Sequence, residues 1–149
     1  MWKQVVNSIE SYLKGDTNLA GINIGQAYDP KTDKVPAIRI MYLGEKTEGG
    51  KRLNADNSLG QKTSVNLIVW MFAKNNKPDP TPEEGYAAIY DLENKVEANL
   101  VKWTRLDHAG ELAGYLIKTT IKDRRINEHD HRPTIGSYFE IEVTCKKVL

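Results

Sequence analysis

One run of adjacent residues combines the side chain types that bind transition metals: Glu128, His129, Asp130 and His131. Carboxylate oxygens and imidazole nitrogens could hold zinc or another transition metal here and so build a metal-dependent catalytic site. Adjacent residues seldom converge on one ion without a distant partner, however, and the two-histidine spacing of metal-binding helices is absent. The pattern therefore favours a solvated turn between two strands, and we expect no metal site.

The other residues that could carry chemistry lack the neighbours that such chemistry requires. His108 is isolated in the sequence, which is more typical of a surface residue than of a base. Cys145 is the only cysteine, so no intrachain disulfide can form, and its place in an alternating pattern favours a core position. Gly49-Gly50-Lys51 lacks the spacing and the strand-to-helix context of a phosphate-binding loop. We expect no catalytic residue and no cofactor.

Arg124 and Arg125, with Arg132 nearby, are the candidates for a basic patch that would bind nucleic acid. Interleaved carboxylates such as Asp123 weaken this interpretation. The 21 basic and 20 acidic residues leave a formal charge of +1, which argues against a surface built mainly for nucleic acid or an anionic membrane. Pairs between Arg124 or Arg125 and interfacial carboxylates are favoured, since the planar guanidinium suits such contacts.

Two helices are predicted to support these segments. Thr81-Pro82-Glu83-Glu84 provides an N-cap hydroxyl, a proline at the first helical position and carboxylates in the first turn. Apolar residues then recur at spacings near three and four as far as Trp103, so this helix needs a sheet to lie on. A first helix is expected within Met1–Lys14, with Gly15 ending it.

Four strands are predicted from alternating apolar residues: Ala37–Leu43, Thr63–Ala73, Leu112–Ile121 and Ser137–Lys147. Consecutive strands are joined by loops without a helix and can pair as antiparallel hairpins. We therefore expect a single α+β domain over residues 1–149, with a four-stranded, mainly antiparallel sheet packed on one face by two helices. Ile22 and Ile24 could add a short edge strand.

Two polar connections complete the pattern. Gly44–Lys62 is longer than most loops of compact domains, and it could be a loose hairpin tip or a long charged arm that orders on binding. Lys122–Pro133 is the second connection. Three aromatic residues are expected to anchor the core or a subunit contact: Trp70, Phe72 and Trp103.

Nothing in the sequence predicts a membrane or export segment. The first residues lack the uninterrupted apolar region of an export signal, and no stretch approaches the ~20 apolar residues that span a bilayer. We expect a soluble protein that stays where it is synthesised.

The chain resembles the tail terminator proteins of long-tailed bacteriophages, together with related minor tail and neck proteins. The resemblance rests on the order and pattern of elements over most of the chain, not on an invariant motif. The following segments carry it: Pro36–Gly44, Val65–Phe72, the long helix, and the strands of Tyr115 and Phe139 that flank Asp123-Arg124-Arg125. It implies a six-membered ring in the tail or neck of the virion, assembled in the host cytoplasm, that caps the tail tube and stops its polymerisation.

This resemblance also implies partners and contact residues. The partners would be other copies of the chain, the tail tube protein and head-tail connector or neck proteins, while DNA would pass through the lumen without specific binding. The expected assembly contacts are Lys46, Glu48, Lys51, Arg52, Asp56, Arg124 and Arg125. Three alternatives stay open: another neck or head-tail connector protein, a small DNA-binding protein, and a metal-dependent protein.

Overall fold

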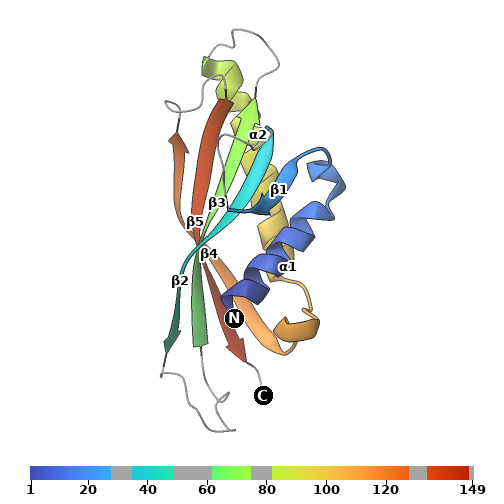
Figure 1. Cartoon of the computed structure of the whole chain (residues 1–149), viewed down its shortest axis with the longest axis vertical. Coiled ribbons are helices and arrows are strands. Elements are labelled where there is room, and N and C mark those ends of the chain that lie inside the picture. The colour runs from blue at the N-terminus through green and yellow to red at the C-terminus, as the bar shows by residue number, and fades with distance from the viewer. Residues whose placement is uncertain (28–34, 49–61, 75–81, 128–133, 148–149) are drawn as a thin grey trace.

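Two helices pack on one face of a twisted sheet in the computed structural model, which describes residues 1–27, 35–48, 62–74, 82–127 and 134–147 (Figure 1). The helices are α1 (Trp2–Lys14) and α2 (Pro82–Thr104). The strands are β1 (Asn23–Gln26), β2 (Ala37–Glu48), β3 (Lys62–Lys74), β4 (Tyr115–Asn127) and β5 (Thr134–Lys147). Short 3-10 turns lie at η1 (Thr17–Leu19) and η2 (Gly110–Leu112). The fold is α+β, as the sequence predicts.

The strand order within the described residues is β1-β2-β3-β5-β4. The pairs β2–β3, β3–β5 and β5–β4 are antiparallel, which confirms the predicted arrangement of the four main strands. The sheet nevertheless has a fifth strand, because β1 pairs in parallel with β2 from Asn23 opposite Ala37 to Gln26 opposite Ile40. A strand of four residues shows too little alternation for the sequence to predict its pairing.

Several strand bounds differ from their prediction. β5 begins at Thr134 instead of Ser137, and β4 begins at Tyr115 instead of Leu112, which lies in η2. β2 continues through Gly44 to Glu48 and pairs with the start of β3, and β4 continues to Asn127. The predicted starts of the polar connections, at Gly44 and Lys122, are therefore wrong. Register shifts at Tyr42/Gly44 and Ile121/Asp123 change which face of the sheet the following residues point to. Cross-strand partners then keep the charged residues in the ladder despite their low strand propensity.

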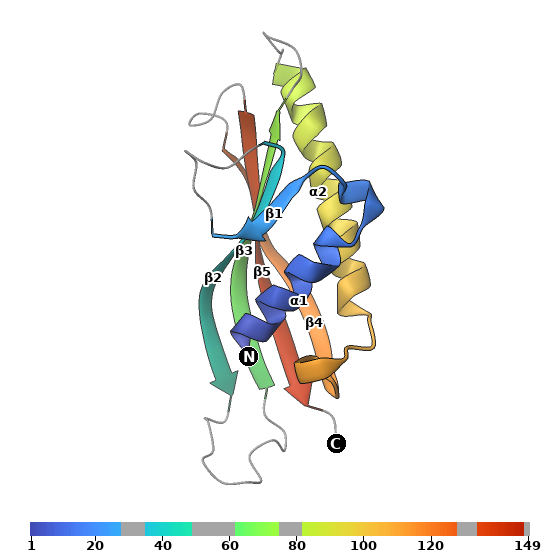
Figure 2. The same cartoon turned by 45° about the vertical axis from the view of Figure 1, so that its right-hand side comes forward.

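The core lies between the sheet and the two helices (Figure 2). α1 and α2 each contribute one apolar stripe, and β3 and β5 contribute every second residue. The main contributors are Val5, Val6, Ile9 and Leu13 of α1; Ile89, Leu92, Val96, Leu100 and Trp103 of α2; Val65, Leu67, Val69 and Met71 of β3; and Phe139, Ile141, Val143 and Cys145 of β5. The indole Nε1–H of Trp103 donates to Ser8 Oγ at 2.9 Å and so joins α2 to α1.

The opposite face of the sheet carries the other expected anchors. Trp70 lies between two aromatic neighbours, with ring centroids 5.8 Å from Phe72 and 4.6 Å from Tyr138. Phe72 is buried, whereas Trp70 and Tyr138 are half-buried. Both described α-helices lie on the other face (Figure 2), so this aromatic group is not part of the core under the helices.

Asp16 connects the turn after α1 to α2 and should make stability depend on pH. Its carboxylate accepts hydrogen bonds from the Asn99 side chain and the Asn18 amide, and the Asn99 contact is the main reason that the Asp16 pKa is lowered. A carboxylate with a lowered pKa stabilises the fold above its unfolded pKa and loses this effect as pH falls through the folded value. Asp16→Asn should therefore be less stable than wild type at pH 7 and approach it near about pH 3.

Urea unfolding at the two pH values measures this difference. Asn99→Ala serves as the matched control, since it should remove most of the effect of Asp16→Asn at neutral pH. A constant gap between wild type and Asp16→Asn across the pH range would contradict the assignment.

Candidate assembly surface

The predicted contact residues do not gather in one place. Lys46 and Glu48 lie near the end of β2, and Arg124 and Arg125 lie on β4, with β3 and β5 between the two strands. The remaining predicted contacts lie outside the described residues, as do the possible metal ligands: Lys51, Arg52, Asp56 and Glu128–His131. The sheet therefore divides the described candidates between two regions.

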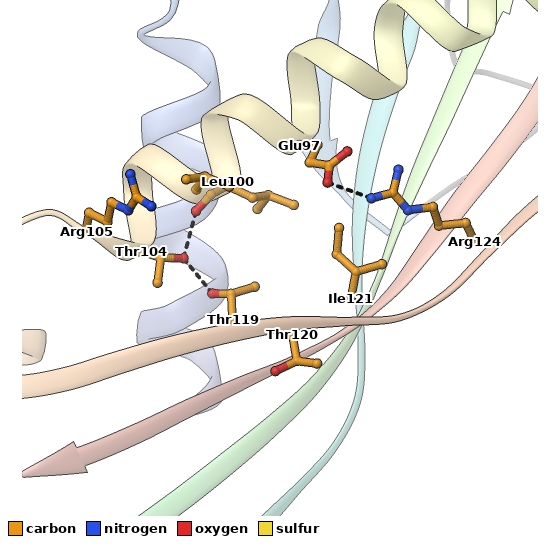
Figure 3. Close-up of a pocket in the computed structure, with 9 residues that line it drawn as sticks. Glu97, Leu100, Thr104, Arg105, Thr119, Thr120, Ile121 and Arg124 are labelled. Carbon is orange, nitrogen blue, oxygen red and sulfur yellow. Dashed lines mark hydrogen bonds and ion pairs between the residues drawn. The ribbon is translucent and has the colours of Figure 1, made fainter.

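Arg124 faces α2 and is already engaged within the chain. Its Nη2 donates to Glu97 Oε1 at 2.6 Å (Figure 3). Its guanidinium also lies 4.9 Å from the ring centroid of Phe139. The hydrogen bond to Glu97 is the main reason that the pKa of Arg124 is raised. About half of the Arg124 side chain remains exposed, at 46%. Its role as an assembly contact stays a prediction.

Arg125 points to the other face of the sheet. Its Nε donates to Asp123 Oδ2 at 2.8 Å, and this hydrogen bond lowers the pKa of Asp123. Arg125 also lies opposite Tyr138 in the ladder. Successive residues of a strand point to opposite faces, so Arg124 and Arg125 cannot form one basic patch on a single face.

The residues at the other end of the sheet form longer ion pairs than Arg124 and Arg125 do. Glu48 lies 3.8 Å from Lys62 Nζ across the hairpin, and Glu45 lies 3.8 Å from the N-terminal amine. Lys46 is exposed beside them. The Glu48–Lys62 pair joins two exposed groups, so it contributes little to stability and leaves Glu48 available to a partner. The side chain of Glu45 is 25% exposed.

A groove between α2 and β4 is a feature that the sequence did not predict (Figure 3). It encloses about 490 Å³ and has an aliphatic wall of Leu100, Val101 and Ile121. The Thr104 hydroxyl donates its one hydrogen to the Leu100 carbonyl, at 2.7 Å. The hydroxyl oxygens of Thr104 and Thr119 are also 2.7 Å apart, and in this second hydrogen bond Thr119 is therefore the donor.

The groove is suited to contact more than to catalysis. Its acidic side chain, Glu97, is paired with Arg124, and the other lining groups include hydroxyls, aliphatic carbons and Arg105. Among the described residues, no group of three or more His, Cys, Asp or Glu side chains could hold a metal ion. In the same part of the chain, no helix has the length and apolar character to cross a membrane.

Exposed apolar side chains lie toward both lateral edges of the sheet. One group lies on α2, just after it, and on β4; the other lies on β2. The first group is Tyr86, Tyr90, Val101, Leu106, Leu116 and Ile126, and the second is Tyr42 and Leu43. The second group extends to α1, because the Tyr42 ring stacks on Trp2 with centroids 4.1 Å apart. Their burial on association would be favourable.

Neither His108 nor Cys145 has the surroundings of a reactive residue. The His108 ring meets Trp103 edge-on at 5.0 Å and is half-buried, which lowers its pKa; it is not the surface residue that its isolation in the sequence predicts. Cys145 is 1% exposed, and burial followed by the nearby charge of Glu45 raises the pKa of its thiol to about 11.

Cys145 should consequently react slowly with thiol reagents in the native protein. At pH 8 only about one molecule in a thousand carries the thiolate at equilibrium, and the side chain is covered as well. A chromogenic disulfide reagent should label the native chain slowly and one thiol per chain rapidly in denaturant. The control is Thr144→Cys, which places an engineered thiol on the opposite, more accessible face of β5 and should react faster than Cys145 in the native state. Rapid labelling of Cys145 in the native wild type would contradict its buried position.

Comparison with known proteins finds similarity at the level of the fold. No protein-family model matches the sequence, and no curated protein matches it. A chain from the solved virion of a native gene transfer agent (GTA) particle is similar in structure, with a TM-score of 0.55. The similarity covers 95% of this chain and 93% of that chain, at 9% sequence identity. The two chains therefore share a fold across nearly their whole lengths.

Proposed function

We propose that this chain is a structural component of a phage-like virion and, more specifically, a tail terminator. In this proposal residues 1–149 act as one domain, and several copies, six by the family resemblance, close a ring on the end of the tail tube. The ring stops tube polymerisation and offers a surface to head-tail connector or neck proteins. The protein works by shape and contact and has no enzymatic activity.

The observation that carries the proposal is the likeness of the whole fold to a chain of a gene transfer agent virion. The described surface is compatible with it. Identical subunits in a ring meet through two different surfaces of each copy. This chain has exposed apolar side chains toward both lateral edges of its sheet, near β2 and near β4. The formal charge of +1 suits a lumen through which DNA passes without being held.

Assembly with the tail tube protein tests the proposal. The purified chain, alone and mixed with its tube protein, is examined by mass photometry and negative-stain electron microscopy. We expect rings in solution or on tube ends, and shorter tubes when the chain is present during tube polymerisation. A chain that stays monomeric and leaves tube length unchanged contradicts the terminator role.

A connector or other neck protein is the second candidate, since the fold likeness to a virion chain supports both. The two differ in what they bind: a terminator attaches to the tube in the absence of heads, whereas a connector attaches to the head portal and leaves tube growth unaffected. Binding to isolated heads without any effect on tubes would favour the connector.

A further inference from the structure

The two edges of the sheet differ in a way that defines a subunit contact. β4 is the last strand in the order, and its thirteen residues have a strand partner on the β5 side alone among the described residues. β1 covers β2 over Ala37–Ile40, so Met41–Glu48 has no described strand on its outer side. Unpaired edges present amide and carbonyl groups that can pair with another chain.

From these edges we infer that the β4 edge of one copy pairs with the free stretch of β2, Met41–Glu48, in the next copy, so that the sheet continues from subunit to subunit. The inference rests on the proposed ring and assigns its contact surfaces. The partner is thus a second copy of this chain, bound head to tail.

The direction of the strands is compatible with this contact. β2 is antiparallel to β3, β3 to β5 and β5 to β4, so β4 runs antiparallel to β2 within one copy. In a ring whose axis runs along the strands, rotation keeps the direction of every strand. β4 therefore meets the next copy's β2 in the antiparallel sense, which continues the ladder already present.

Charge favours this pairing over contact between two β4 edges. β4 carries four basic residues and one acidic residue: Lys118, Lys122, Arg124, Arg125 and Asp123. Two such strands side by side would repel each other. The free stretch of β2 carries two acidic residues, Glu45 and Glu48, and one basic residue, Lys46. The Glu48 side chain is 63% exposed and the Glu45 side chain 25%. Complementary charge thus selects the head-to-tail contact over a two-fold dimer.

The groove beside β4 gives this contact an apolar component. Tyr42 lies on the helix side of β2, because its ring stacks on Trp2 of α1. The groove also lies on the helix side, between α2 and β4, and Val101 in its wall is 43% exposed. A sheet that continues across the interface places helix-side residues of both copies next to one another, so the neighbour's Tyr42 would lie at the groove.

Charge reversal on each edge tests the contact in full-length protein. One variant carries Lys118→Glu and Lys122→Glu on β4; the other carries Glu45→Lys and Glu48→Lys on β2. Each should weaken ring formation by at least about tenfold in dissociation constant, and the combination of all four changes should restore most of it. Exchanging Asp91 and Lys95, an exposed pair on α2, is the matched control and should change nothing. Circular dichroism and thermal unfolding verify that each variant folds.

Mixing the two variants distinguishes head-to-tail from two-fold association. In an equimolar mixture, the intact β4 edge of one variant meets the intact β2 edge of the other, and the two reversed edges also attract each other. Alternating rings should therefore form in the mixture although neither variant forms them alone, whereas two-fold pairing of β4 edges would stop at dimers. If rings form and neither reversal affects them, the edge contact is wrong while the proposed function stands. Association that depends on β4 alone would show a two-fold dimer and overturn the contact. If wild type forms no assembly even with tube protein, both inferences fail.

Discussion

Replacing Trp103 with alanine should lower the free energy of unfolding by about 3–5 kcal/mol. The side chain is 1% exposed in the last turn of α2, so its removal leaves a large cavity between both helices and the sheet. The change also removes the hydrogen bond from Nε1 to Ser8 Oγ, which joins α2 to α1. Since domains are typically stable by about 5–15 kcal/mol, this loss is a large fraction of the total stability.

Urea unfolding monitored by far-ultraviolet circular dichroism measures the loss. Trp103→Phe retains most of the apolar volume and should cost less, and Ser8→Ala should report the hydrogen bond, at about 1 kcal/mol. Val101→Ala, on the exposed side of the same helix, is the control and should cost well under half as much as Trp103→Ala. Equal losses for Trp103→Ala and Val101→Ala would show that α2 packs through a different face.

Phe139→Ala should have a comparable effect, about 3–5 kcal/mol, because Phe139 is fully buried in β5, where the sheet meets α2. The Arg124 guanidinium loses its aromatic partner in the same change. Glu140→Ala is the adjacent control. Glu140 points to the other face and has a 3.9 Å ion pair with Lys122, so we expect less than about 1 kcal/mol.

Thermal or urea unfolding of the two variants measures which face of β5 is buried. A strand places successive side chains on opposite faces, and a large difference between neighbours is the signature of one buried and one accessible face. If Glu140→Ala were as damaging as Phe139→Ala, the face of the sheet away from the helices would also be packed in solution.

The helices were predictable because their signals are local. Pro82 begins α2, as its place after Thr81 predicts, and Trp103 lies in its last turn. Gly15 follows α1 directly, although it has φ −81° and so lacks the left-handed conformation expected of a glycine at this place. A capping residue and a 3.6-residue period act within a few turns, so no distant segment is needed to specify them.

The candidate site was less predictable, and the arginines show why. The sequence placed Arg124 and Arg125 together in a polar connection, whereas β4 continues through them and sends one to Glu97 on α2 and the other to Asp123. The groove was missed for a related reason. Val101 and Ile121 line it from a helix and a strand that have no sequence pattern in common.

By itself, the sequence determined the two helices and the approximate positions of the four main strands, because apolar residues repeat at the local spacing of each element. The tertiary structure alone decided where β2 and β4 end, that β1 joins in parallel, and which two edges of the described sheet stay open. Strand pairing joins residues far apart in the chain, so the partner of each amide and carbonyl is fixed only when the whole sheet has assembled.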